Sequence, residues 1–355
     1  MVRILRLIAR WLVALIASRP APDPPRKRSR PFYVIGHRGS PCSEVENTIQ
    51  SYETAIERDG ANGIELDLCL TADGVVLVWH DWDPEDAICD IRARGLEPDV
   101  LYCPCIPDRE DLHKTISHLQ CADVVANFGY VLKKDTKVQA HGVIPLFDEV
   151  MAWAVKKPSL EILFLDIKIP ANELEIVPRM LDAIDEILRR HKPKFRVVFE
   201  TSIAEVVEAM KRHAPHHQFT LDVSAPAGIA IDPLKFSAMG EAIALGNQLA
   251  TAQRPRQITA APWTTYQRIV EHDVSIRDHV RGVPPTLICF TVNAEEEMRW
   301  LLAMGVDGIQ TDRPDLLRRI VDELRLPLHD AAANGNGSAI AKEQNGRREN
   351  TTEKT

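Results

Sequence analysis

Residues 63–68 read Gly-Ile-Glu-Leu-Asp-Leu, a short apolar run in which every second position from Glu65 is a carboxylate. Side chains alternate between the two faces of a β-strand, so Glu65 and Asp67 point to one side and the aliphatic residues to the other. Two carboxylates on one face of a buried strand repel each other unless a cation lies between them. The segment therefore predicts a buried strand that carries an acidic site.

Similar apolar runs occur along the chain and alternate with helical patterns. The candidate strands are 33–36, 63–68, 75–79, 162–167, 195–199, 219–223, 287–292 and 306–311. The amphipathic helical segments include 48–58 (entered by an Asn47-x-x-Gln50 capping pattern), 174–190, 204–212 and 294–304. Strands alternating with helices favour a parallel sheet, and eight of them predict an α/β fold of the (β/α)8 barrel type. Residues 71–74 are too short for a helix, so the join between the second and third runs departs from this repeat.

The chain ends differ in composition from its middle. Residues 1–18 are apolar apart from three arginines at helical spacing, but the apolar run 11–17 is too short to span a bilayer. This segment is typical of an amphipathic helix on a membrane surface or of a signal peptide, and a helix packed on the barrel is the third alternative. We expect it to be membrane-associated, while secreted and cytoplasmic locations stay open.

Three regions follow from these patterns. Residues 1–31 form the amphipathic segment and a proline-rich basic linker, and residues 32–328 form the barrel. Residues 329–355 have a polar composition that predicts a disordered tail, because they cannot bury enough apolar surface to fold.

The charge balance limits the partners of this protein. The 355 residues include 43 Lys+Arg and 51 Asp+Glu, which gives a formal net charge of −8. The dense basic run at 26–30 lies in the linker, so the composition argues against a nucleic-acid partner.

The stretch 82–140 is longer than a loop requires and predicts an insertion after the third strand. It carries Cys89, Cys103, Cys105 and Cys121, whose spacing fits no C-x2-C metal motif. We expect packed or idle thiols, with a disulfide or a zinc site as alternatives. The insertion shapes substrate specificity or only stabilises the barrel, and the sequence favours neither.

Ionisable residues occur where the predicted strands end, which is where barrel enzymes build their active sites. They are His37 and Arg38 after the first strand, Glu65 and Asp67 in the second, His80 and Asp81 after the third, Asp166 and Lys168 at the fourth, and Glu200 at the fifth.

Glu65, Asp67 and Asp166 offer three carboxylates, a donor set of oxygen atoms that suits Mg²⁺ or Ca²⁺ better than zinc. Ion pairs to Arg38 and Lys168 are the alternative explanation. His37 and His80 end the strands expected on either side of the carboxylate strand, an arrangement typical of general acid/base chemistry.

Arg38 and Lys168 add fixed positive charge, which an anionic phosphate substrate requires. The spacing alone therefore predicts a divalent-metal barrel enzyme that acts on a phosphate ester. It does not name the alcohols on either side of the phosphate.

These motifs resemble the glycerophosphodiester phosphodiesterase family of the phospholipase C-like phosphodiesterase superfamily. The resemblance covers about 33–320, and its motifs are Gly36-His37-Arg38-Gly39, Glu46-Asn47-Thr48, Glu65-x-Asp67, His80-Asp81, Leu165-Asp166-Ile167-Lys168, Thr291-Val292-Asn293 and the run from Gly305 to Pro314. It implies a (β/α)8 barrel that cleaves glycerophosphodiesters to sn-glycerol 3-phosphate and an alcohol with Mg²⁺ or Ca²⁺.

The resemblance also implies a role for each matching residue. It makes His37 and His80 the acid/base pair, Glu65, Asp67 and Asp166 the metal ligands, and Arg38 and Lys168 the phosphate contacts. Glu46, Glu200 and Phe290 are candidate accessory residues. By the same analogy, the 2-hydroxyl of glycerol is the nucleophile, and attack on the phosphate forms a cyclic phosphate that water opens.

Three positions depart from the family pattern. Asp166 stands where many members have Glu, Glu200 replaces a commonly uncharged residue, and Phe290 lies directly before Thr291. Asp166 and the N-terminal segment favour one alternative, a membrane phospholipid phosphodiesterase of phospholipase C or D type. An inactive binding barrel is the alternative from a different class.

Overall fold

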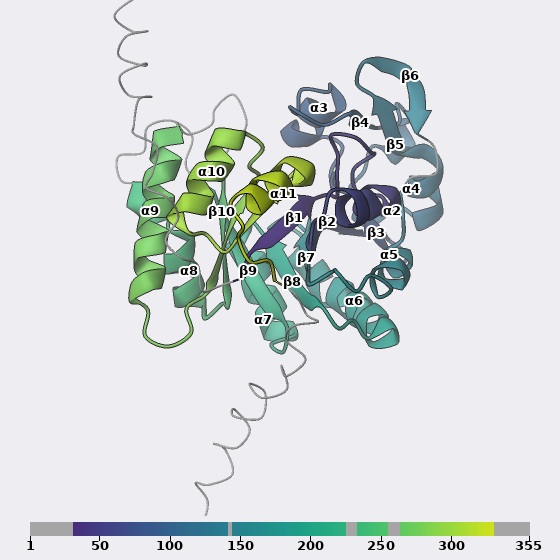
Figure 1. Ribbon diagram of the computed structural model, residues 1–355. Coiled ribbons are helices and arrows are strands. Elements are labelled where there is room, and N and C mark those ends of the chain that lie inside the picture. Colours follow the sequence, from purple (N-terminus) through teal and green to yellow (C-terminus); the bar gives the residue numbers. More distant parts are fainter. Residues whose placement is uncertain (1–30, 141–143, 225–232, 255–262, 330–355) are drawn as a thin grey trace, which may run out of the picture.

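The computed structural model describes residues 31–140, 144–224, 233–254 and 263–329. Its centre is a closed barrel of parallel strands surrounded by helices (Figure 1). In order around the barrel the strands are β1 (Tyr33–His37), β2 (Gly63–Leu70), β7 (Ile162–Ile167), β8 (Arg196–Thr201), β9 (Gln218–Ser224), β10 (Leu249–Gln253), β11 (Thr286–Phe290) and β12 (Gly308–Thr311). Strand β1 pairs in parallel with both β2 and β12, which closes the ring. The predicted (β/α)8 architecture is confirmed.

The run 75–79 is not a barrel strand, contrary to the sequence prediction. It contains β3 (Val76–Val78), which pairs antiparallel with the end of β2. The short join before it forms a turn, in which the Thr71 hydroxyl accepts from the Val75 amide at 3.0 Å. So short a join cannot cross over to a parallel neighbour, and the chain therefore reverses direction.

The eighth barrel strand is β10, which was not predicted from the sequence. Its sequence Leu-Ala-Thr-Ala-Gln has a single β-branched residue, so it lacks the composition of a typical strand. The two alanines are buried all the same, and β10 pairs in parallel with β9 and β11.

Helices cover the outside of the barrel (Figure 1). They are α2 (Ile49–Glu53), which continues as a π-helical turn, η1 (Thr54–Arg58), then α5 (Phe147–Ala154), η4 (Leu174–Ile176), α6 (Val177–His191), α7 (Ala204–His213), η5 (Pro233–Phe236), α8 (Ala238–Leu245), α9 (Trp263–His279), α10 (Glu295–Met304) and α11 (Pro314–Glu323). The main hydrophobic core lies between these helices and the outward faces of the strands.

A second, smaller core fills the inside of the barrel. It consists of Tyr33, Ile35, Ile162, Phe164, Val198, Leu249 and Ile288. Two glycines make room for it, since a Cβ at Gly63 would lie 2.8 Å from Ile35 and Ile162, and one at Gly308 would lie 2.6 Å from Ile288. Because strand side chains alternate, His37, Glu65, Asp166 and Glu200 lie on the same inward face, nearer the carboxyl ends of the strands.

The insertion forms a small unit beside the carboxyl end of β2. Its elements are α3 (Ala87–Ala93), β4 (Tyr102–Cys105), η2 (Glu110–Leu112), η3 (Ile116–His118), α4 (Cys121–Asn127), β5 (Gly129–Leu132) and β6 (Asp135–Ala140), with the strands in an antiparallel sheet in the order β4-β5-β6. Trp79 joins it to the barrel, because its ring packs edge-on against Tyr130 at 5.1 Å between centroids.

The cysteines of the insertion are free thiols, so the disulfide alternative is wrong. Cys89 and Cys103 are buried, and Cys105 and Cys121 are partly buried. Within the described residues, none of them belongs to a group of side chains whose ligand atoms gather closely enough for a metal ion. This is the packed-thiol arrangement that we expected.

No helix in the described part of the chain is both long and apolar enough to cross a membrane. Residues 1–30 and 330–355 lie outside the described residues, so the amphipathic segment, the linker and the disordered tail stay predictions.

Candidate active site

Three carboxylates lie together at the carboxyl end of the barrel. Glu65 and Asp67 extend from β2, and Asp166 is the register partner of Asp67 on the neighbouring strand β7. One oxygen atom from each of the three lies within 4.8 Å of the others. The structure therefore brings together the three side chains that the sequence singled out as metal ligands.

The charge balance of this group leaves room for a cation. Burial raises the pKa of Glu65 well above its ordinary value, and the charges of Asp67 and Asp166 raise it further. Burial also raises the pKa of Asp166 despite the adjacent Lys168. Burial opposes ionisation of Asp67 too, but Lys168 and Arg38 outweigh it and lower the pKa. Three carboxylates with oxygen donors only, two of them costly to ionise, fit a Mg²⁺ or Ca²⁺ ion.

The alternative ion pairs are present as well. Lys168 Nζ lies 2.8 Å from Asp67 Oδ1 and also contacts Asp166. Arg38 Nε lies 3.0 Å from Asp67 Oδ2. Neither pair includes Glu65, whose Oε2 instead accepts from the Arg38 backbone amide at 2.9 Å. The two cations therefore account for part of the negative charge only.

Arg38 is held in a buried network rather than extended toward solvent. Its Nη1 lies 3.0 Å from Glu46 and 3.3 Å from Glu97. Glu46 also contacts Arg92, which in turn contacts Glu97. Glu46 is thus a structural partner of two arginines and does not join the three carboxylates. Arg92 and Glu97 come from the insertion, and neither was predicted from the sequence as a site residue.

Asn47 connects the loop after β1 to the carboxylate strand. Its backbone has a φ of +57°, a left-handed conformation that Asn tolerates better than most residues. Its Nδ2 donates to Asp67 Oδ2 at 2.7 Å, and its Oδ1 accepts from Tyr52 at 3.1 Å. The N-cap of α2 is therefore Thr48 rather than Asn47, since the Thr48 hydroxyl accepts from the Ser51 amide.

His37 ends β1 and is oriented by Asp312. Its Nδ1 lies 2.7 Å from Asp312 Oδ1, and its Nε2 lies 3.9 Å from Glu65 Oε2. Asn293 fixes the carboxylate in turn, because its Nδ2 donates to Asp312 Oδ2 at 2.7 Å while its Oδ1 accepts from the Thr311 hydroxyl and the Asp312 amide. A carboxylate only accepts, so Nδ1 carries a proton and Nε2 is the ring atom that faces the site.

His80 follows β3 rather than a barrel strand, which corrects its expected position. The antiparallel turn of β3 nevertheless brings it to the same end of the barrel. Its Nδ1 lies 2.7 Å from Asp81 Oδ1, which also accepts from Arg92 Nε at 3.0 Å. Burial, followed by the charges of Arg92 and Lys168, lowers the pKa of His80 to about 3. The ring is therefore neutral, with Nε2 free of the proton.

Two of the accessory candidates, Glu200 and Phe290, are not members of the group of three carboxylates. Glu200 on β8 is the register neighbour of Asp166, but its carboxyl accepts from Gln310 Nε2 at 3.3 Å. Burial raises the pKa of Glu200 well above its ordinary value, and Asp222 raises it further. Phe290 is a buried residue at the end of β11.

A cavity of about 440 Å³ opens beside these groups. His80, Asp166 and Lys168 form one part of its wall. The start of the insertion forms another part, with Trp82, Asp83, Glu85, Asp86 and Thr115. The insertion therefore shares the wall of the cavity, which favours a role in substrate specificity over stabilisation alone.

The fold and the site define a hydrolase of phosphoric diesters. The family model for the glycerophosphoryl diester phosphodiesterase family matches residues 37–316, so the chain belongs to this family. A glycerophosphodiester phosphodiesterase from Bacillus altitudinis is 24% identical over 82% of this chain and 99% of its own length.

Two solved structures share the fold. A Silicibacter pomeroyi protein superposes with a TM-score of 0.64 at 20% identity, covering 86% of this chain and 97% of its own. An Oleispira antarctica phosphodiesterase was solved in complex with the product sn-glycerol-3-phosphate. It has a TM-score of 0.55 at 17% identity, and the match covers 81% of this chain and 96% of the Oleispira chain.

Proposed function

We propose that this protein is a metal-dependent enzyme that hydrolyses glycerophosphodiesters to sn-glycerol 3-phosphate and an alcohol. The observation that carries the proposal is the pair of histidines, each oriented by its own carboxylate, beside a group of three further carboxylates. The product bound to the Oleispira antarctica relative supports the same reaction for this chain.

Glu65, Asp67 and Asp166 would hold the metal ion, Mg²⁺ or Ca²⁺. When bound, the ion supplies positive charge that attracts the phosphodiester and stabilises negative charge on its oxygens. Lys168 lies beside two of these ligands and borders the cavity, so its ammonium group stabilises the same charge from the side. Arg38 holds Asp67 and Glu46 in place and adds further positive charge.

The histidines divide the proton transfers between them. His80 is neutral and accepts the proton of the attacking hydroxyl group through Nε2. His37 delivers a proton to the oxygen of the leaving alcohol, with Asp312 holding its ring in one orientation. We propose the 2-hydroxyl of glycerol as the nucleophile, because its position favours a five-membered cyclic phosphate. A substrate without this hydroxyl should react far more slowly, and an unchanged rate would exclude the cyclic route.

The charge of the cavity favours certain alcohols. Asp83, Glu85 and Asp86 lie at its edge, and the one lysine among the residues that line it is Lys168. An anionic head group would meet this acidic edge, whereas a neutral or cationic one would not be repelled. We therefore expect glycerophosphocholine to be a better substrate than a glycerophosphodiester with an anionic head group.

The test measures release of sn-glycerol 3-phosphate from glycerophosphocholine with and without EDTA. The wild-type protein and His37→Ala are compared with His279→Ala. His279 ends α9 just before β11, so it lies at the amino end of the barrel strands and the site lies at the carboxyl end. Activity that requires both metal and His37 but not His279 would support the proposal. Activity that survives EDTA would show that the reaction does not require a metal ion, and that part of the proposal would be wrong. No activity with any added metal would overturn the substrate assignment, and phospholipid vesicles would be tried next.

A further inference from the structure

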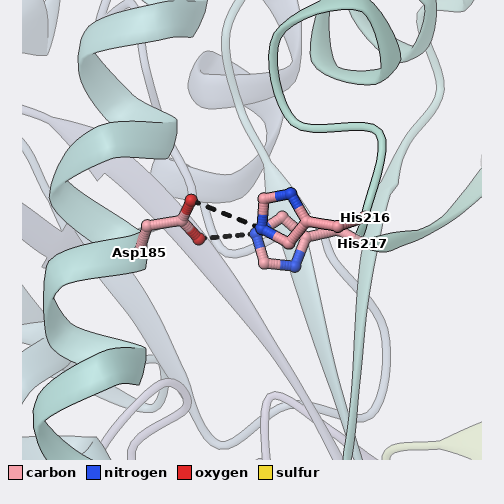
Figure 2. Close-up of side chains that lie close together, drawn as sticks. All are labelled: Asp185, His216 and His217. Carbon is pink, nitrogen blue, oxygen red and sulfur yellow. Dashed lines mark hydrogen bonds and ion pairs between the residues drawn. The ribbon is translucent and has the colours of Figure 1, made fainter.

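A second cluster of metal-binding side chains lies on the outside of the barrel. Asp185 is on α6, and His216 and His217 form the end of the loop between α7 and β9 (Figure 2). Strand β9 begins directly after His217, so the cluster lies at the amino end of the barrel strands. The candidate active site lies at their carboxyl ends, and the two places are distinct.

Both histidines direct the same atom at one carboxylate (Figure 2). His217 Nε2 lies 2.5 Å from Asp185 Oδ1, and His216 Nε2 lies 3.7 Å from Asp185 Oδ2. The two rings lie beside each other with 4.1 Å between their centroids. One ligand atom from each residue lies within 4.8 Å of the other two.

A single histidine would be enough to satisfy the carboxylate. His217 already does so and also packs against Phe199, with 4.5 Å between ring centroids. His216 has no comparable support, since its side chain is 65% exposed and its 3.7 Å contact with Asp185 is longer than a hydrogen bond permits. Its ring lies against that of His217, and its Nε2 is directed at the carboxylate that His217 already satisfies.

We propose that Asp185, His216 and His217 bind a divalent transition-metal ion, with Zn²⁺ as the probe of choice. Two imidazole nitrogens and one carboxylate oxygen form a donor set that suits zinc, in contrast to the oxygen-only group of the active site.

The cluster requires only a small adjustment to hold the ion. Ligand atoms lie about 2 Å from zinc, and therefore roughly 3.3 Å from one another in a tetrahedral site. The contact between Asp185 and His217 has to lengthen by less than about 1 Å, and that between Asp185 and His216 has to shorten slightly. The side chain of Asp185 is partly exposed and that of His216 is largely exposed, so both have room to move. The exposed side leaves the fourth position to water.

The neighbouring pair of Asp182 and His213 offers a matched control. It joins the same helix, α6, to α7 through a contact of 2.7 Å between His213 Nε2 and Asp182 Oδ1. In the described part of the chain this pair belongs to no group of three potential ligands. Removing His213 therefore removes an equivalent histidine from the same face without touching the proposed site.

The experiment titrates Zn²⁺ into the full-length protein in excess Ca²⁺, which occupies the active-site carboxylates, and follows binding by calorimetry. Wild-type protein and His213→Ala should bind one more equivalent of Zn²⁺ than His216→Ala and Asp185→Asn. With Co²⁺ in place of Zn²⁺, the visible absorption of a site with nitrogen ligands should appear in the wild-type protein and His213→Ala only. Zn²⁺ should raise the melting temperature by about 2 °C or more, because the ion binds the folded chain alone.

Two results would overturn the proposal. One is undiminished Zn²⁺ binding in both His216→Ala and Asp185→Asn, and the other is no Zn²⁺ binding by the wild-type protein in excess Ca²⁺. His216 is exposed and far from the reacting groups, so His216→Ala should fold and keep its phosphodiesterase activity. That activity also separates a failure of this proposal from a failure of the proposed function.

Discussion

Replacing Asp312 by asparagine tests how the orientation of His37 is fixed. In the wild-type protein both carboxylate oxygens of Asp312 are acceptors, one from His37 Nδ1 and one from Asn293 Nδ2, each at 2.7 Å. An asparagine at this position has only one oxygen, so its amide nitrogen must face one of these two donors. The structure determines which donor that is.

Asn293 cannot turn its side chain to accommodate the change. Its Oδ1 accepts from the Thr311 hydroxyl and from the backbone amide of residue 312, each at 3.0 Å. The new amide nitrogen must therefore face His37, which has to present an unprotonated Nδ1 and carry its proton on Nε2. A ring with this single proton cannot give it up from Nε2 without becoming an anion, so His37 can no longer act as the proton donor.

We expect Asp312→Asn to lower kcat by about 10²- to 10⁴-fold, the range typical of a general acid/base residue held in the wrong tautomer. KM should change little, since Asp312 lies behind the histidine. Release of sn-glycerol 3-phosphate from glycerophosphocholine at saturating metal measures both constants. Circular dichroism melting checks that the variant is folded.

A double variant separates the tautomer from general damage. In Asp312→Asn combined with Asn293→Asp, one oxygen of the carboxylate introduced at position 293 accepts from the amide nitrogen at position 312, whose amide oxygen can turn back to His37 Nδ1. The other oxygen at position 293 can still accept from the Thr311 hydroxyl, so part of the lost kcat should return. A single Asp312→Asn variant within about threefold of wild type would refute the reasoning, because general acid/base groups contribute far more.

Three further predictions follow from the charges of the site and the chain ends. Burial raises the pKa of Glu200, so the free energy of unfolding of the wild-type protein should fall as the pH rises above the ordinary carboxyl range. In denaturant titrations at several pH values, Glu200→Gln should show a weaker dependence of this free energy on pH. Its kcat should stay within about threefold of wild type. Glu85→Gln should lower kcat/KM for glycerophosphocholine by about 1.5- to 5-fold without affecting glycerophosphoglycerol, whose head group is neutral, and equal effects on both would contradict an electrostatic role. The full-length chain should float with anionic liposomes, and a chain starting at residue 31 should not. If both chains sediment, the prediction of a membrane-surface helix is wrong.

The residues of the candidate active site could be predicted from the sequence because they lie near strand ends. Glu65, Asp67 and Asp166 were expected together because each lies near the carboxyl end of its strand. That their strands are direct neighbours was not predicted, since 75–79 was expected to lie between them. His80 was predicted at the right end of the barrel for a reason that proved wrong, since β3 runs antiparallel.

The partners that orient these groups could not be predicted in the same way. Asp312 lies 275 positions from His37, and Arg92 and Glu97 reach the site only because the insertion folds back against the barrel. No local pattern fixes which side chains meet over such separations. Asp312 follows the last barrel strand, so the rule about strand ends could have found it had it been applied there too. Strand β10 was missed because alanine carries little information about strands.

The apolar side chains inside the barrel determine how reactants come and go. Tyr33, Ile35 and Phe164 belong to the cluster that fills the amino end of the barrel, so the barrel interior is open at its carboxyl end only. Substrate, water and both products share one opening. The product that binds deeper has to leave before the next substrate can enter. We therefore expect sn-glycerol 3-phosphate to inhibit competitively as it accumulates, raising the apparent KM and leaving kcat unchanged.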